Sequence, residues 1–250
     1  MKKYIKSVIV ALTSLLAVSA SAEVFKLQSP DGKLQVEIDV DKCFTISAKI
    51  GDRVFLKKVK ASMTTPRAKI CAGLPYSLDR RFHRGDVPSE DFNQLEYSYT
   101  NNGYKVYVRA YNDAIAYRVE IKNHPVTEVI NSEQLDITGS FAYGNVKDAP
   151  FCFWNGTREK VMLNQLAFVE TSDADYPPMK IKNQKGSGII STDFKKYKSD
   201  DEFEPEYIYK LNGKAKLLPW RAFTSVYGYA DPQIKNLKLR LEKYDNRKKN

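Results

Sequence analysis

Histidine and cysteine are scarce in this chain of 250 residues, which contains two histidines and three cysteines. The histidines are His83 and His124, and the spacings of Cys43, Cys71 and Cys152 match no zinc-binding motif. The sequence therefore predicts no zinc site. Each cysteine has apolar neighbours, which favours buried free thiols, and one disulfide among the three is the alternative in an oxidising compartment.

Long apolar runs are absent beyond the N-terminus. The chain opens with three lysines and a short, mostly apolar run, and an Ala20-Ser21-Ala22 motif precedes Glu23. This pattern is typical of a cleavable signal peptide, and it is too short for a membrane span. We expect residues 1–22 to be removed from a periplasmic or secreted protein that has no membrane span.

The net charge is basic, at +10 from 40 Lys and Arg against 30 Asp and Glu. A basic patch for nucleic acid is one interpretation. However, the basic residues are scattered among acidic ones, and export argues against a nucleic-acid partner. We favour a solvated surface, with one domain at residues 23–243 and a charged tail at residues 244–250.

Alternation of period two dominates the rest of the sequence. In "KLQVEIDV", residues 33–40, apolar Leu34, Val36 and Ile38 alternate with polar neighbours. Similar short runs, of which "LKLRLEKY" is the last, are separated by turn signals such as "SPDGK", "NNGY" and "LNGK". The pattern predicts an all-β fold, an antiparallel sandwich or barrel. No convincing helical face follows residue 22, and "SEDFNQLEY" is compatible with one short helical turn only.

The stretch "VYVRAYNDAIAYRVEI", residues 106–121, reads as two strands around a polar Asn112-Asp113 pair. Alternate apolar residues fall on one face of each strand, from Val106 in the first to Ile121 in the second. Asn and Asp tolerate the left-handed backbone conformation that a tight hairpin needs. The pattern alone predicts a β-hairpin whose polar tip is a turn.

Part of this stretch, "RAYNDAIAYRVEI", resembles a segment of the N-terminal domain of glycoside hydrolase family 97. Three more stretches resemble the family in the same order, "LQSPDGKLQVEIDV", "LAFVETSDADYPPMKI" and "LPWRAFTSV", and the four run from about Phe25 to Leu241. Ala114 and Pro178 depart from the family, which usually has glycine at both places. The resemblance implies a large antiparallel β-super-sandwich like that of galactose mutarotase.

The resemblance also implies what surrounds such a domain. In the family, a (β/α)8 barrel follows the sandwich and carries the catalytic carboxylates and most ligands of a calcium ion. A barrel needs about 250 residues of its own, and this sequence ends about where the family's chain would enter it. We therefore expect the noncatalytic domain, without a cofactor of its own. Calcium would be held only with a partner barrel, because the ion takes roughly six to eight oxygens.

Acidic and aromatic residues cluster in "FVETSDADYPP", where carboxylates and a phenol suit sugar hydroxyls or calcium. We take Glu170, Asp175 and Tyr176 from this stretch as candidate ligand-binding residues, with a solvated loop as the alternative. Trp154 and Glu159 in "FCFWNGTREKVML" complete the set. Trp154 ends a predicted strand, so a sugar-stacking face and a core position are equal alternatives. Glu159 is the only acid in the region that resembles the family's calcium-ligand segment. No catalytic residue is predicted.

Three other large side chains favour structural roles. Trp220 enters an apolar strand, which favours a core position over a ligand contact. Arg118 and Arg221 lie inside predicted strands, and a buried arginine normally needs a carboxylate partner. We expect structural ion pairs at both arginines rather than substrate clamps.

Two functions from different classes remain. The first is a stand-alone noncatalytic module that binds carbohydrate or a partner protein and assists glycan degradation in the periplasm. The second is a subunit that completes a two-chain α-glycosidase with a separately encoded barrel. Mutarotase-like epimerase chemistry needs a histidine acid and a carboxylate base. It is disfavoured, because His83 lies in the very basic "DRRFHRGD", which we expect to be a loop, and His124 precedes Pro125.

Overall fold

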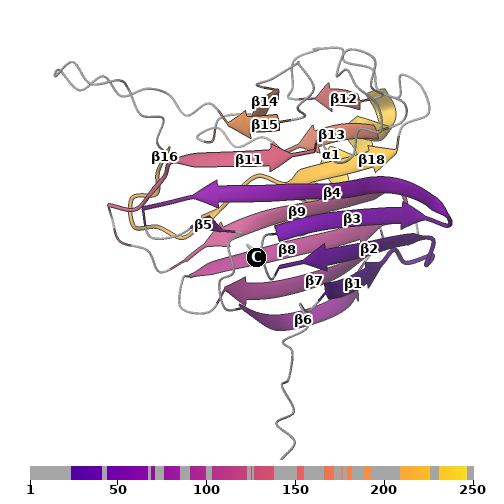
Figure 1. Ribbon diagram of the computed structural model, residues 1–250, viewed down its shortest axis with the longest axis horizontal. Helices are drawn as coiled ribbons and strands as arrows, with labels where there is room; N and C mark the ends of the chain where they lie inside the picture. The colour runs from indigo at the N-terminus through magenta and orange to yellow at the C-terminus, as the bar shows by residue number, and fades with distance from the viewer. Residues whose placement is uncertain are drawn as a thin grey trace, which may run out of the picture.

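The chain is all-β apart from one helix in the described part of its computed structural model, and the strands form two packed sheets (Figure 1). The described residues are 24–40, 44–66, 69–70, 76–84, 91–99, 103–122, 125, 127–137, 151–154, 166–171, 176, 179–181, 189–192, 209–225 and 231–246. Within them, each of the two sheets has eight strands, and two further strands form a separate pair.

The first sheet has the strand order β1-β2-β3-β4-β11-β15-β14, with β5 paired to β4. Its strands are β1 Val24–Gln28, β2 Leu34–Asp39, β3 Phe44–Ile50, β4 Arg53–Thr64, β5 Lys69–Ile70, β11 Ser132–Asp136, β14 Met179–Ile181 and β15 Ile189–Thr192. All of their pairings are antiparallel.

The second sheet has the order β12-β13-β18-β9-β8-β7-β6, with β17 paired to β9. Its strands are β6 Tyr76–Arg84, β7 Phe92–Tyr99, β8 Tyr104–Tyr111, β9 Ala114–Ile121, β12 Phe151–Trp154, β13 Leu166–Glu170, β17 Lys216–Leu217 and β18 Arg221–Ser225. Here β12 and β13 run parallel, whereas the other neighbours are antiparallel. The separate pair is β10 Val129–Ile130 with β16 Tyr209–Lys210.

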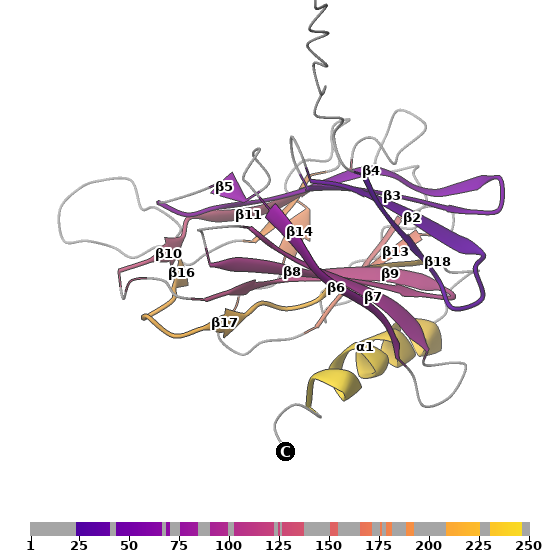
Figure 2. The same cartoon turned by 90° about the horizontal axis from the view of Figure 1, so that it is seen from below.

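The main core lies between the two sheets, whose layers are seen on edge in Figure 2. The predicted alternation is confirmed in β2, where Leu34, Val36 and Ile38 are buried and the residues between them are not. Inward-facing residues of β8 and β9, such as Val108 and Tyr117, join the same cluster. Period two thus marked the inward faces correctly, because the two sheets bury these faces against each other.

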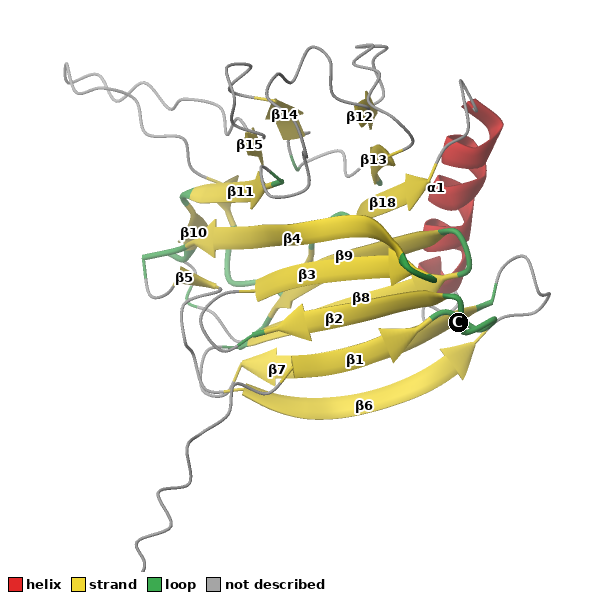
Figure 3. Cartoon of the chain, turned by 45° about the vertical axis from the view of Figure 1, so that its right-hand side comes forward, coloured by secondary structure: helices red, strands yellow, loops and turns green. Residues whose placement is uncertain are grey.

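The outer face of the second sheet is covered by helix α1, Asp231–Asn246 (Figures 2 and 3). The strand predicted for "LKLRLEKY" is wrong. Leu237, Leu241 and Tyr244 are spaced for one helical face and are buried against this sheet, whereas Leu239 is 56% exposed. The helix continues past residue 243, where we expected the charged tail to begin.

Two smaller expectations are also corrected. The stretch "SEDFNQLEY" contributes strand β7 rather than a helical turn, because β6 and β8 pair with it on both sides. His83, expected in a loop, lies on β6 opposite Asn93. Of the cysteines, only Cys152 is described, as a backbone position on β12, and Cys43, Cys71 and His124 lie outside the described residues.

The turn "SPDGK" between β1 and β2 forms as predicted. The Ser29 hydroxyl donates to Asp31 Oδ1 at 2.6 Å, and the amide of Lys33 donates to the same oxygen at 3.0 Å. Gly32 has a φ of +73°, a conformation that glycine adopts without strain. The turn is therefore specified by its own residues.

The predicted hairpin is confirmed: β8 and β9 pair antiparallel, with Ala110 opposite Ile115, and the Asn112-Asp113 tip joins them. The expected left-handed conformation is wrong at both residues, since positive φ angles among the described non-glycine residues occur only at Lys58 and Asn212. The tip is held instead by contacts with neighbouring elements. Asn112 Oδ1 accepts a hydrogen bond from the Asp31 amide at 3.0 Å, and Asp113 pairs with Arg240 of α1 at 2.8 Å.

A double-mutant cycle on Asp113 and Arg240 tests this contact. Because the Asp113 side chain is 47% exposed, we expect a coupling of only about 0.5–1 kcal/mol, and it should shrink as salt is added. The cycle compares D113A, R240A and the double variant by urea unfolding. Asp52→Ala in the exposed β3–β4 turn is the control. A coupling that salt leaves unchanged would contradict an ion pair at this tip.

Candidate functional site

Arg221 of β18 lies between two carboxylates contributed by different sheets. Its Nε and Nη2 donate to the two oxygens of Glu133 on β11 at 3.0 and 2.9 Å. Its Nη1 donates to Glu170 on β13 at 2.8 Å. The three side chains are buried, and Arg221 is only 1% exposed. The bidentate geometry is the strong form of an arginine–carboxylate contact, and here it links the two sheets.

Tyr176 and Met179 complete this buried polar cluster. The Tyr176 hydroxyl donates to Glu133 Oε2 at 2.6 Å, and the amide of Met179 donates to the Glu170 carboxylate at 3.2 Å. The Tyr176 ring packs edge-on against Tyr209, with 4.9 Å between centroids. Each polar group therefore has a partner within the protein, as burial requires.

The opposite charges of Arg221 and Glu170 each act against the effect of burial on the other group's pKa. Burial alone would lower the pKa of Arg221, but Glu133 and Glu170 raise it above its ordinary value. Burial raises the pKa of Glu170, while Arg221 opposes that rise. Burial and Glu133 also raise the pKa of Tyr176 well above its usual range. Arg221 is thus held protonated and Tyr176 neutral.

Two converging carboxylates also invite comparison with a glycosidase acid–base pair. Such a pair flanks a scissile bond and must reach the substrate. Glu133 and Glu170 are buried instead, and both accept hydrogen bonds from one arginine. The cluster therefore acts as a link between the sheets, and the ion pair expected at Arg221 is confirmed.

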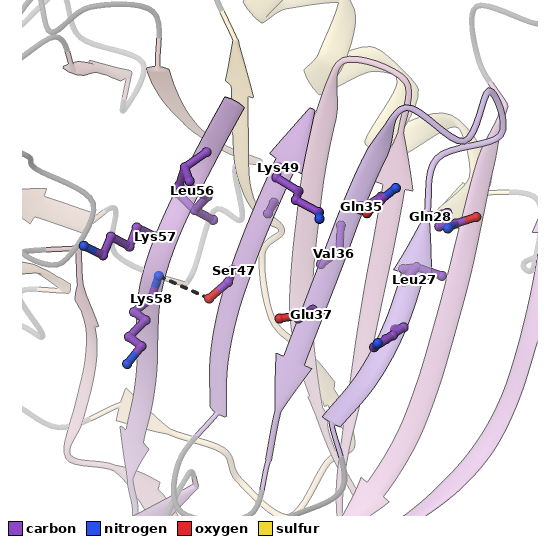
Figure 4. Close-up of a pocket in the computed structure, with 13 residues that line it drawn as sticks. Leu27, Gln28, Gln35, Val36, Glu37, Ser47, Lys49, Leu56, Lys57 and Lys58 are labelled. Atoms are coloured by element: carbon purple, nitrogen blue, oxygen red, sulfur yellow. Dashed lines mark hydrogen bonds between the residues drawn. The ribbon is translucent and has the colours of Figure 1, made fainter. Parts of the chain in front are cut away.

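A separate open hollow lies on the outer face of the first sheet, across β1 to β4 (Figure 4). Its volume is about 390 Å³. The exposed and half-buried residues that line it are Lys26, Gln28, Gln35, Glu37, Ser47, Lys49, Val54, Lys57 and Lys58, and four buried apolar residues line it as well, Leu27, Val36, Ala48 and Leu56. We call this hollow the β1–β4 groove.

Strand register arranges the groove in rows. Gln28 pairs with Gln35, Gln35 with Lys49, and Lys49 with Val54, so one row crosses all four strands. Figure 4 shows Lys49 extending from β3 toward Gln35. With neighbouring strands about 4.8 Å apart, the row spans about 14 Å. Amide and ammonium groups in such a row can contact several units of an extended ligand.

A bulge in β4 forms one side of the groove. The register shifts between Ile46 and Ala48 of β3, so Lys57 and Lys58 stand together opposite Ser47. The amide of Lys58 donates to Ser47 Oγ at 3.3 Å, and Lys58 has a φ of +48° (Figure 4). A left-handed lysine is uncommon, which makes this bulge a feature that needs explanation.

The sequence model of the glycosyl-hydrolase 97 N-terminal family matches residues 27–154, about half of the chain. The chain belongs to this family. No curated protein sequence matches it. The match covers the hairpin and the "LQSPDGKLQVEIDV" stretch and confirms the family that they resemble, and the two packed sheets agree with the expected super-sandwich.

Solved structures resemble this family 97 domain in fold. A β-arabinopyranosidase is 13% identical with a TM-score of 0.54, and the match covers 81% of this chain and 40% of that one. A family 97 enzyme from Pseudoalteromonas sp. strain K8, in complex with acarbose, is 14% identical with a TM-score of 0.54, covering 81% and 35%. A variant of a family 97 enzyme from the same strain was solved with panose. The chain thus spans well under half the length of these enzymes.

Of the five predicted ligand-binding residues, this family 97 domain brings Glu170 and Tyr176 together, through Glu133 and Arg221. Both are buried, at 7% and 4% exposure, and their contact with a sugar stays a prediction. Trp154 ends β12 opposite Val169, and its side chain lies outside the described residues. So do Glu159 and Asp175.

Sequence reasoning missed Glu133 and the groove. Glu133 shares the buried face of β11 with Leu135, so an acid at an inward position of period two was the available signal. Trp220 is buried, as expected, and the guanidiniums of Arg109 and Arg118 lie 4.2 and 4.4 Å from its ring centroid. The Arg118 guanidinium also lies 5.4 Å from the Tyr107 ring centroid, and the carboxylate partner expected for it stays a prediction.

The described residues do not fit a calcium site of their own. Among them, no group of three His, Cys, Asp or Glu side chains gathers at one place. The converging carboxylates Glu133 and Glu170 face Arg221, whose positive charge would repel a cation. In the part of the chain that was searched, no helix is long and apolar enough to cross a membrane.

Proposed function

We propose that this chain is a noncatalytic, carbohydrate-binding module that assists glycan degradation in the periplasm, and that the β1–β4 groove is its binding site. The observation that carries the proposal is the row of two amides and one ammonium group, Gln28, Gln35 and Lys49, across strands β1 to β3 of that groove. Planar amides and charged donors are the groups that orient sugar hydroxyls. Membership of a family with members solved in complex with acarbose and panose supports a glycan as ligand.

A noncatalytic role is supported by where the described carboxylates lie. Glu133 and Glu170 are committed to Arg221, and Glu96 pairs with Lys105 at 3.0 Å. Glu37 in the groove is flanked across the strands by Lys26 and Ser47, with no second carboxylate among the described lining residues. Hydrolysis by the usual route needs two carboxyl groups at a set separation. The groove therefore suits binding.

Calorimetry with the mature chain, residues 23–250, tests the proposal. We expect at least one oligosaccharide in a panel of neutral and acidic glycans to bind in the micromolar to millimolar range. Gln35→Ala should weaken that binding, because it removes the amide at the centre of the row. Lys60→Ala is the matched control, since Lys60 is exposed on β4 outside the groove lining. Silence across the panel from folded protein would overturn the proposal.

A second candidate function is favoured by the coverage of the solved enzymes, of which the chain spans 35–40%. In this version the module completes a two-chain α-glycosidase with a separately encoded barrel, and calcium is held only by the two chains together. The barrel chain should then co-purify with this one, and the pair should hydrolyse an aryl α-glycoside that neither chain cleaves alone. An independent and fully active barrel would contradict it.

A further inference from the structure

We infer that the β1–β4 groove is selective for acidic glycans, whose sugars carry carboxylate or sulfate groups. The inference rests on the proposed carbohydrate-binding function and adds the class of sugar. Four lysines line the groove, Lys26, Lys49, Lys57 and Lys58, against the single carboxylate of Glu37. The groove is thus positive at neutral pH, and it favours ligands of opposite charge.

The positions of these charges determine which part of a ligand each of them can contact. Lys26 is paired across the strands with Glu37, so the one acid of the groove stands beside one lysine. Lys49 instead lies between Gln35 and Val54, in the row of amides. An acidic group held by the Lys49 ammonium would bring neighbouring hydroxyls over Gln28 and Gln35. The row therefore combines one charge contact with neutral hydrogen-bonding groups.

The bulge supplies a second, independent observation. Lys58 has a φ of +48°, a conformation that favours glycine or asparagine over other residues. A lysine at this position adopts an unfavourable backbone conformation, and Lys58 is among the residues that line the groove. Strained backbone of this kind concentrates at functional sites. A contact between Lys58 and an acidic ligand explains why a lysine, rather than a glycine, occupies this position.

The groove lacks what a neutral sugar site usually offers. None of the described residues that line it is aromatic, so a pyranose ring has no flat apolar face on which to stack. Its one large exposed apolar side chain is Val54, which is 63% exposed. Without stacking on an aromatic ring, charge contacts and hydrogen bonds carry a larger share of the affinity. This favours an acidic sugar over a neutral one.

The test titrates the mature chain with three matched oligosaccharides at low salt: a galacturonate trimer, a sulfated dextran fragment and neutral maltotriose. We expect the acidic ligands to bind at least tenfold more tightly than maltotriose, with affinity falling as salt rises. Stronger binding of the uronate assigns a carboxylate to the groove, and stronger binding of the sulfated fragment assigns a sulfate.

Two groove variants and one control locate the binding. Lys49→Gln and Lys58→Gly should each weaken acidic-glycan affinity about fivefold. The second variant relieves the left-handed backbone, and urea unfolding of both variants checks that each is folded. Lys60→Gln, on the same strand outside the groove, should leave affinity unchanged. An equal loss in Lys60→Gln would show diffuse charge attraction and overturn the inference. Binding of maltotriose alone would overturn it while leaving the proposed function intact, and no binding of any glycan would overturn both.

Discussion

Replacing Arg221 with methionine is expected to lower the free energy of unfolding by about 3–5 kcal/mol at neutral pH. The guanidinium is 1% exposed and makes three hydrogen bonds to Glu133 and Glu170. Without it, two buried carboxylates lose their cation and repel each other. Urea unfolding of wild type and R221M, fitted with a common slope, measures the loss.

The cost of R221M is expected to grow with pH. Burial raises the pKa of Glu170 above 4.5, and Arg221 opposes that rise. Because the folded protein then binds the proton more readily than the unfolded chain, stability falls as pH rises from 4.5 through the folded pKa. Removing Arg221 moves the folded pKa further up. The two proteins should therefore differ least near pH 4.5 and most above neutrality.

A triple variant separates charge from packing. Adding Glu133→Gln and Glu170→Gln to R221M removes both unpaired carboxylates. The triple variant should therefore recover much of the lost stability, and the remaining difference from wild type should no longer grow through the titration of Glu170 in the variant. If R221M alone costs less than about 1 kcal/mol at every pH, the cluster does not stabilise the contact between the sheets in the way its geometry indicates.

The strands were predictable because burial of one face imposes alternation on the sequence. Leu34, Val36 and Ile38 follow it, and so do the inward residues of β8 and β9. Helix α1 was not predictable from the same rule. Leu237, Leu239 and Leu241 alternate as in a strand, and only the contacts of Leu237 and Leu241 with the second sheet show which period operates.

The candidate sites, too, were predictable from the sequence only in part. Glu170, Tyr176 and Arg221 were singled out from local sequence, but their common partner Glu133 lies 88 residues from Arg221 in the chain. Only the packing of the two sheets brings it there. The β1–β4 groove depends on strand register and on a bulge at Lys58, which local sequence does not determine. The sequence indicated which residue types were candidates, whereas only the folded structure shows which of them lie together.

Replacing Trp220 with alanine is expected to cost about 3–5 kcal/mol of stability. The indole is 1% exposed and belongs to the cluster beneath helix α1. Arg109 and Arg118 lie over its ring at 4.2 and 4.4 Å, so its removal also leaves two guanidiniums without the aromatic face that they share. Circular dichroism should follow the unfolding, because the substitution removes one of the two tryptophans.

The matched variants distinguish loss of the ring from general disturbance of the helix. Trp220→Phe keeps an aromatic face and should cost less than half as much as the alanine variant. Leu239→Ala on α1 should change stability by no more than about 0.5 kcal/mol, because that leucine is 56% exposed. Amide exchange in α1 should accelerate in W220A and not in L239A, since the helix packs on the cluster that Trp220 fills. Unchanged exchange in W220A would show that Trp220 does not hold the helix on the sheet.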